Sequence, residues 1–267
     1  MELSVNGHAV YAHTGGRAFD PALPAVVLIH GAGMDHTVWS LQTRYLAHHG
    51  RAVLAVDLPG HGRSAGAPLA SVAEMADWVV ALLDAAGVQR AALVGHSMGA
   101  LVALDCAARH GERVESLALL GVAEVMPVHP DLLAAAAAND PSSIDLVIGW
   151  GHGPRGHVGG SAAPGLALLP GGRRLMQRTA PGVLGIDLAA CNAYTGGAKA
   201  ASAVACPALF LLGAADRMTP AKAGRALAAR IKTSRVVVLP GIGHMVMTED
   251  PDAAVDALAE HLAPNAR

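Results

Sequence analysis

Short, almost wholly apolar segments alternate with longer amphipathic segments along most of this chain. The apolar segments are rich in Val, Leu and Ala and occupy residues 26–29, 52–56, 91–94, 116–120, 208–212 and 235–239. Such runs are typical of strands covered on both faces in a parallel sheet. Segments with helical periodicity lie at residues 38–49, 72–86, 100–109, 222–231 and 251–262. The alternation predicts an α/β protein with a mostly parallel central sheet, flanking helices and right-handed crossovers.

The two ends of the chain carry local signals. Residues 3–5 and 8–12 flank Asn6-Gly7, a dipeptide that favours an antiparallel hairpin. Near the C-terminus, Glu249-Asp250-Pro251 precedes the last helical segment. Proline suits the first helical turn, and acidic side chains stabilise a helix N-terminus, so we expect both acidic residues to act there.

The alternation stops between residues 125 and 204, where Gly and Pro accumulate. A helical stretch persists at 130–139, and the strand pattern restarts only after Pro207. We therefore expect residues 125–204 to form a helical cap, inserted into a core made of residues 1–124 and 205–267. Within the cap, residues 149–157 are expected to form a mobile loop. Its histidines lack an acidic partner at metal-ligand spacing, so no metal site is predicted.

Composition excludes several classes of protein. Hydrophobic residues make up 52% of the 267 and charged residues 15%, which allows a large buried core and excludes a disordered chain. The net charge is −2 without a basic stripe, so no nucleic-acid partner is expected. No uncharged apolar run reaches about 18 residues, and no secretion signal is visible, so no membrane association is expected. The three widely spaced cysteines favour reduced thiols in a cytoplasmic protein, which we expect to be a monomer or homodimer.

The strongest chemical signal is the sequence Gly95-His96-Ser97-Met98-Gly99, which follows a predicted strand and opens a predicted helix. A strand-to-helix turn this sharp strains the backbone of its central residue and leaves no room for neighbouring Cβ atoms. Glycines at 95 and 99 meet that requirement. The pattern predicts that Ser97 is a nucleophile presented at the carboxyl edge of the sheet.

A serine hydroxyl needs a base, and His244 is the best placed of the 14 histidines. It follows the last predicted strand, between glycines that let the loop fold back over the sheet edge. Asp216 follows the preceding strand and would orient His244 and stabilise its imidazolium. Asp216 could also be a helix N-cap and His244 an ordinary loop histidine. The chain order Ser97, Asp216, His244 favours the catalytic interpretation.

The segment from His30 to Met34 follows the first apolar strand and is rich in glycine. An acyl-transfer intermediate needs two N–H donors for its oxyanion. We expect these to be the amides of Met98 and Ala32, with Gly33 or Met34 as alternatives to Ala32 if the register differs.

Five motifs together resemble those of the α/β-hydrolase superfamily, in particular its small, cap-bearing esterases and lactonases. They cover nearly the whole chain in order: His30 to Gly33, Asp57 to Ser64, Gly95 to Gly99, Gly213 to Asp216, and Gly243-His244 followed by Glu249 to Pro251. The resemblance implies hydrolysis of a small or medium ester or lactone through an acyl-enzyme, without a cofactor. It also implies that the cap shapes the acyl pocket.

Other members of this superfamily give alternatives. Epoxide hydrolases and haloalkane dehalogenases place Asp at the nucleophile, so Ser97 argues against both. Carbon–carbon bond hydrolases often carry Asn where this chain has His96, which makes that activity less favoured. Enol-lactone hydrolysis, perhydrolysis and acyl transfer would use the same residues. A ligand-binding receptor of the same fold would not need the complete set.

The substrate pocket is expected to be aliphatic, because aromatic residues make up only 3% of the chain. We predict that Gly33, Met34, Trp150, Met218 and Met245 contact the substrate. Flexible thioethers beside the catalytic loops would line an adaptable apolar surface. Such a pocket should accept aliphatic acyl groups and offer little aromatic stacking.

Overall fold

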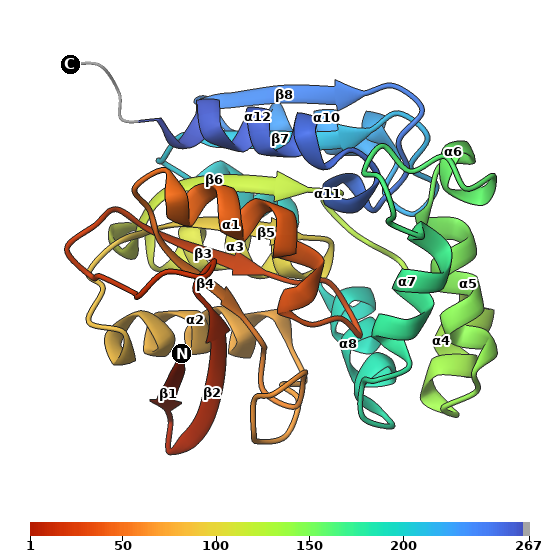
Figure 1. Cartoon of the computed structure of the whole chain (residues 1–267), viewed down its shortest axis with the longest axis horizontal. Helices are drawn as coiled ribbons and strands as arrows, with labels where there is room; N and C mark the ends of the chain where they lie inside the picture. Colours follow the sequence, from red (N-terminus) through yellow and green to blue (C-terminus); the bar gives the residue numbers. More distant parts are fainter. Residues whose placement is uncertain (264–267) are drawn as a thin grey trace.

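The computed structural model describes residues 1–263, which contain an eight-stranded, mostly parallel sheet (Figure 1). Its strand order is β1-β2-β4-β3-β5-β6-β7-β8. The strands are β1 (Glu2–Val5), β2 (His8–His13), β3 (Ala25–Ile29), β4 (Ala52–Val56), β5 (Ala91–His96), β6 (Val114–Leu120), β7 (Ala208–Gly213) and β8 (Ser234–Leu239). The pairs β1–β2 and β2–β4 are antiparallel and the others are parallel. Both the predicted α/β sheet and the N-terminal hairpin are confirmed.

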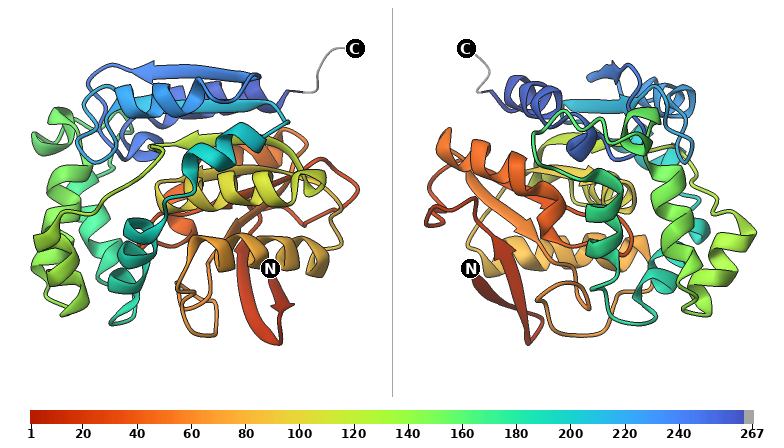
Figure 2. Two further views of the ribbon diagram at one scale, coloured as in Figure 1. Left: turned by 180° about the vertical axis from the view of Figure 1, so that it is seen from behind. Right: turned by 45° about the vertical axis from the view of Figure 1, so that its right-hand side comes forward.

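Helices cover both faces of the sheet (Figures 1 and 2). Along β3, Val27 and Ile29 pack in the cluster that contains α2 and α3, whereas Val26 and Leu28 pack in the cluster that contains α1 and α12. This alternation explains why the strand is apolar at every position. The core helices are η1 (His36–Trp39), α1 (Ser40–His48), α2 (Val72–Ala85), α3 (Met98–Arg109), η2 (Gly111–Arg113), α10 (Ala221–Ala228), α11 (Val246–Glu249) and α12 (Pro251–Leu262).

The strand order reverses at β3, whose neighbours are β4 on one side and β5 on the other. In open parallel sheets, ligands bind outside the carboxyl ends of the strands at such a point. The loop after β3 and the turn after β5 therefore lie where a binding crevice is expected.

Six helices lie between β6 and β7, and this part of the described chain has no strand. They are α4 (Pro130–Ala137), α5 (Ser142–Gly151), α6 (Pro154–His157), α7 (Leu168–Met176), α8 (Val183–Ala193) and α9 (Gly197–Ala203). In Figure 1, α4 to α7 lie beyond the end of the sheet toward which β6 and β8 point. Helix α9 instead packs on α3, since Ala200 and Ala201 belong to the same buried cluster as that helix. The division of the chain at residues 125 and 204 stays a prediction.

Two local expectations were wrong. Residues 149–157 are not an irregular loop, because they lie in the end of α5, a two-residue connection and α6. At the start of α12, only Asp250 caps the helix, by accepting from the Ala253 N–H at 3.2 Å. Glu249 is buried and points toward other backbone amides, described below. Among residues 1–263, no helix is long and apolar enough to cross a bilayer.

Candidate active site

Ser97 lies between the last residue of β5 and the first residue of α3, with a φ of 55°. A Cβ added to Gly95 would lie 2.2 Å from the carbonyl oxygen of Gly99, and one added to Gly99 would lie 2.3 Å from that of Ile29. Both distances are far below van der Waals contact. The sharp turn predicted from the sequence therefore exists, and it requires glycine on both sides of the serine.

Asp216 and His244 lie in hydrogen-bond contact after β7 and β8. The Nδ1 of His244 donates to Oδ2 of Asp216 at 2.8 Å and lies 3.1 Å from the hydroxyl of Thr219. That hydroxyl donates to the same carboxylate oxygen at 2.7 Å, while Oδ1 accepts the backbone N–H groups of Met218 and Thr219. Burial alone would raise the pKa of Asp216, but His244 and the Thr219 hydrogen bonds outweigh it and hold this pKa below its usual range. Asp216 is therefore a carboxylate that can stabilise a positive charge on His244.

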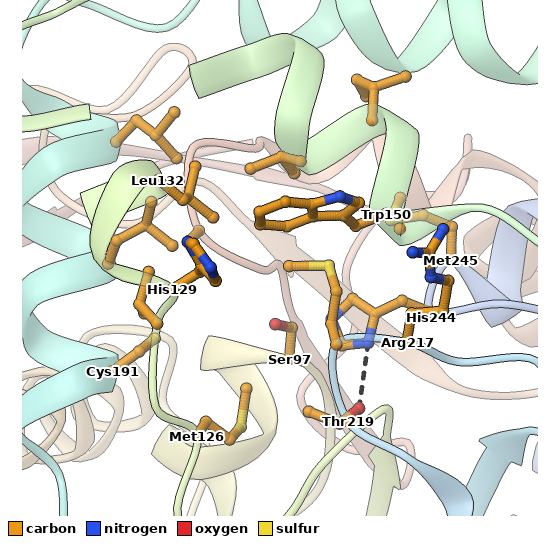
Figure 3. Close-up of a pocket in the computed structure, with 18 of the residues that line it drawn as sticks. Ser97, Met126, His129, Leu132, Trp150, Cys191, Arg217, Thr219, His244 and Met245 are labelled. Carbon is orange, nitrogen blue, oxygen red and sulfur yellow. Dashed lines mark hydrogen bonds between the residues drawn. The ribbon is translucent and has the colours of Figure 1, made fainter. Parts of the chain in front are cut away.

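The other nitrogen of His244, Nε2, is buried and has no hydrogen-bond partner among residues 1–263. Because Nδ1 donates its proton to Asp216, Nε2 carries a lone pair. Figure 3 shows the Ser97 hydroxyl beside the ring but directed away from it. The hydroxyl must turn toward Nε2 before a proton can pass between them, and such tightening is common when substrate binds.

His96 packs against His244 and is hydrogen-bonded to its backbone. Its Nε2 donates to the backbone oxygen of His244 at 3.0 Å, and the two ring centroids are 4.8 Å apart. Burial, reinforced by the neighbouring His244, lowers the pKa of His96 to about 3, so the ring is neutral. The sequence identified His96 only as a variable position of the motif, and its supporting role depends on a contact 148 residues away along the chain.

The loop after β3 lies directly on the turn that carries Ser97. A Cβ added to Gly31 would come within 3.2 Å of the Ser97 Cβ. Two amides of this loop are engaged: Met34 N–H donates to Gly31 O at 3.2 Å, and Gly33 N–H donates to Asp187 Oδ2 at 2.8 Å. These bonds remove Gly33 and Met34 as alternative oxyanion donors. Ala32 is left as the candidate from this loop.

The amides of Ala32 and Met98 have no acceptor among residues 1–263. Ala32 lines the cavity beside Ser97, and Met98 is the first residue of α3, where N–H groups lack partners within the helix. Both N–H groups are therefore available as hydrogen-bond donors, which is what an oxyanion would need.

A cavity of about 280 Å³ opens above Ser97 (Figure 3). Of the five residues predicted to contact substrate, Met34, Trp150, Met218 and Met245 line this cavity. Gly33 does not line it, whereas Leu184 of α8 does, and a Cβ added to Gly33 would lie 2.8 Å from Cδ1 of Leu184. The remaining walls are largely apolar and include Met126, Leu132, Val147, Ile148, Leu188 and Cys191.

Four polar residues of the cavity are not predicted as site residues from the sequence: His129, His152, Arg217 and Thr219. Arg217 and His129 lie on opposite sides of Ser97 in Figure 3. Arg217 directly follows Asp216, and this adjacency was an available signal. His129 comes from the segment before α4, where no motif marks it.

One cluster within residues 1–263 places three possible metal ligands close together: Asp35, His36 and Asp57. Their ligand atoms are engaged by the protein, however. Nδ1 of His36 donates to Asp57 Oδ1 at 2.8 Å, and Asp57 also accepts the N–H groups of His36 and Arg63. Asp35 accepts from Thr37. The cluster therefore joins the segment after β3 to the segment after β4 by hydrogen bonds.

The loop that carries His244 is bonded to the helical segment between β6 and β7, which contains α4 to α9 and is called the inserted segment below. The N–H of His244 donates to the Gly151 carbonyl at 2.8 Å. Glu249, which is only 3% exposed, accepts the Gly243 N–H at 3.0 Å with Oε1 and the Gly153 N–H at 2.8 Å with Oε2. One buried side chain thus joins the histidine loop to the connection between α5 and α6.

The chain resembles known hydrolases over nearly its whole length. The chain is 30% identical over 275 residues to the pimeloyl-[acyl-carrier protein] methyl ester esterase of Chromobacterium violaceum, covering 91% of this chain and 96% of that one. The crystal structure of the enol-lactonase from Burkholderia xenovorans LB400 superposes with a TM-score of 0.84 at 25% identity, covering 99% and 100% of the two chains. A 99-residue stretch, 37% of this chain, is 43% identical to the dihydrolipoyllysine-residue acetyltransferase component of the acetoin cleaving system of Pseudomonas putida, and the match spans only 26% of that longer protein.

The family described as alpha/beta hydrolase fold matches residues 24–251, which include Ser97, Asp216 and His244. The chain therefore belongs to the alpha/beta hydrolase fold family.

Proposed function

We propose that this protein is a serine hydrolase that cleaves a small or medium carboxylic ester or lactone through an acyl-enzyme. The observation that carries the proposal is that Ser97 and His244 line one largely apolar cavity, while Nδ1 of the buried His244 donates to Asp216 and its Nε2 has no partner among residues 1–263. Nucleophile, base and orienting carboxylate are thus in the order required for acyl transfer.

In the first half of the reaction, Ser97 Oγ attacks the substrate carbonyl carbon and its proton passes to Nε2 of His244. The carbonyl oxygen becomes negative and accepts the Ala32 and Met98 N–H groups. Collapse of the intermediate breaks the acyl–oxygen bond, and His244 gives its proton to the departing alkoxide. In the second half, water attacks the acyl carbon and gives a proton to His244; the bond between the acyl carbon and Ser97 Oγ then breaks, and His244 returns the proton to Oγ as the acid leaves.

The character of the cavity supports a mainly aliphatic acyl group of modest size. Its walls are largely Met, Leu, Val and Ile, and its volume of about 280 Å³ suits a small molecule. Each buried methylene of the substrate would contribute about 0.8 kcal/mol. The names of the esterase and enol-lactonase relatives support the same bond type, since both open and cyclic esters contain an acyl–oxygen bond.

The decisive experiment compares the wild type with Ser97→Ala on a panel of p-nitrophenyl esters of increasing acyl length, aromatic esters and lactones. Ser97→Ala should lower kcat by about 10⁵-fold or more, because the remaining groups of the triad cannot act without the nucleophile. Ser202→Ala, which changes an exposed serine of α9, is the matched control and should retain full activity.

Mass spectrometry of the wild type with a slowly hydrolysed ester should find the acyl group on Ser97. Full activity of Ser97→Ala would exclude the proposed mechanism. Turnover of a vinylogous diketone without ester turnover would replace it with carbon–carbon bond hydrolysis, and tight ligand binding without any turnover would identify a receptor.

A further inference from the structure

Asp187 is fully buried although its side chain is a carboxylate, and it belongs to α8 of the inserted segment. Its Oδ2 accepts two hydrogen bonds, one from the Gly33 N–H at 2.8 Å and one from Nε2 of His61 at 2.8 Å. Gly33 lies in the loop after β3, and His61 lies in the loop after β4. One carboxylate therefore joins the inserted segment to both loops of the sheet edge.

The partners of His61 identify it as the positive half of a buried ion pair. Its Nε2 faces Asp187 and its Nδ1 lies 3.0 Å from the Pro59 carbonyl, and neither of these oxygens can donate. Both ring nitrogens must therefore donate, which requires the imidazolium. Burial alone would lower the pKa of His61, but Asp187 and the Pro59 carbonyl raise it above its usual value. The positive charge of His61 therefore holds the Asp187 carboxylate in place, in addition to the two hydrogen bonds that Oδ2 accepts.

The inserted segment holds Gly33 by both of its backbone polar groups. Its N–H is bonded to Asp187, and its carbonyl accepts from the Thr179 hydroxyl at 2.7 Å. Gly33 has a φ of 65° and is the third residue of the turn that Met34 N–H closes on Gly31 O. A positive φ at this position is typical of a type II turn, in which the peptide between the second and third residues has one definite orientation.

That peptide joins Ala32 to Gly33. An acceptor at the Gly33 N–H stabilises its orientation, and a buried N–H without an acceptor would favour rearrangement of the turn. Ala32 is the second residue of the same turn, and its own N–H is the candidate oxyanion donor. A change in the turn would therefore move that donor relative to Ser97.

We propose that Asp187 is a positioning residue for the oxyanion hole: by binding the Gly33 N–H, it holds the turn that directs the Ala32 N–H at the substrate oxygen. The proposal rests on the acyl-transfer function proposed above. It assigns part of the catalytic geometry to the inserted segment, and not to the sheet core alone.

The test uses Asp187→Ala and Asp187→Asn in the full-length protein, with p-nitrophenyl butyrate as substrate. Asp187→Ala removes the acceptor of Gly33, and kcat should fall about 100-fold while KM changes by less than about threefold, because an oxyanion contact acts mainly in the transition state. Asp187→Asn keeps one acceptor oxygen and should give an intermediate kcat. Asp145→Ala, which changes a more exposed carboxylate of α5, is the matched control.

Two inhibitors distinguish a positioning role of Asp187 at the oxyanion hole from a general role in holding the inserted segment in place. Butylboronic acid forms a tetrahedral adduct with the serine and places a negative oxygen in the oxyanion hole, whereas N-methylbutyramide resembles the ground state. In Asp187→Ala, affinity for the boronic acid should fall by about the same factor as kcat, and affinity for the amide should stay unchanged.

A rise in KM at unchanged kcat, or equal loss of affinity for both inhibitors, would overturn the proposal and leave Asp187 as a structural residue of the cap. If both Asp187 variants fail to fold, Thr179→Val tests the same turn through the Gly33 carbonyl. It should lower kcat and not raise KM, and the opposite pattern would overturn the proposal. Failure of the acyl-transfer function itself is distinguishable, because the wild type would then lack ester turnover or Ser97→Ala would retain it.

Discussion

The edge of the sheet and the inserted helical segment are built by different means. Around Ser97, the glycines face backbone atoms, and an added Cβ on Gly99 would lie 2.3 Å from the Ile29 carbonyl oxygen. In the inserted segment, Gly149 and Gly171 have no atom within 4 Å of such a Cβ. The nucleophile is thus placed by backbone packing that tolerates no added atom. The faces of α5 and α7 at Gly149 and Gly171 carry no such constraint, although a Cβ added to Gly185 of α8 would lie 2.8 Å from the Ala136 carbonyl oxygen.

The largest effect is expected from Gly99→Ala, which tests this difference directly. Its methyl group must displace the backbone of β3, which is fully buried, so we expect loss of more than about 3 kcal/mol of folding free energy or no folded protein. Urea unfolding followed by circular dichroism measures the change.

Gly171→Ala is the matched substitution in α7 of the inserted segment. Gly171 is exposed within a helix and nothing lies near its Cα, so alanine should stabilise the protein by up to about 1 kcal/mol. Equal destabilisation by the two substitutions would show that the proposed difference between the regions is wrong.

The same difference explains which features could be predicted from the sequence. The strands and core helices have local causes, namely apolar runs, helical periodicity and capping residues, and all the predicted strands are present. The motif around Ser97 is also local. Its glycines and the positive φ of Ser97 follow from the sharp turn alone.

Contacts between the two regions could not be predicted in this way. Asp187 and Gly33 are 154 residues apart, and Glu249 and Gly153 are 96 apart. No periodicity or motif links such positions, so Glu249 was assigned to the adjacent helix N-terminus, where acidic residues are common. Gly33 was expected in the substrate pocket for the same reason, since the sequence does not show that α8 covers it.

Acid should destabilise the sheet edge through two buried histidines. Burial, reinforced by a neighbouring histidine, lowers the pKa of His30 to about 4 and that of His96 to about 3, whereas an unfolded histidine titrates near 6.5. Between these values the unfolded chain binds about two more protons than the folded chain. The stabilisation from these two groups is therefore complete above about pH 6.5 and is lost toward acid, by about 2 kcal/mol per pH unit between pH 6 and pH 4.

His96→Asn removes one of the two titrations and should reduce this slope by about half, measured as the free energy of unfolding in urea at several pH values. His48→Asn changes an exposed histidine of α1 and should leave the slope unchanged. His61 has the opposite sign: its pKa is raised in the folded state, so its contribution to stability is complete below pH 6.5 and is lost as the pH rises from there through the raised pKa. An unchanged slope in His96→Asn would show that this ring is not kept neutral by burial.

A further effect is expected where the two regions meet. Glu249 accepts one N–H from the histidine loop and one from the inserted segment, and a glutamine at this position has only one acceptor oxygen. In Glu249→Gln, the amide NH₂ must face one of the two N–H groups, so we expect a loss of about 1–3 kcal/mol of stability. Because Gly243 precedes His244, kcat should also fall, by about tenfold.

The control is Glu260→Gln, which changes an exposed carboxylate of α12 that is paired with Arg235 of β8. It should alter stability by less than about 1 kcal/mol and leave kcat unchanged. Hydrogen exchange of the Gly153 and Gly243 amides locates the effect: faster exchange at both, with the remainder of α5 unchanged, is the pattern that a shared buried acceptor requires. Wild-type stability and activity in Glu249→Gln would mean that the two regions are held together by packing alone.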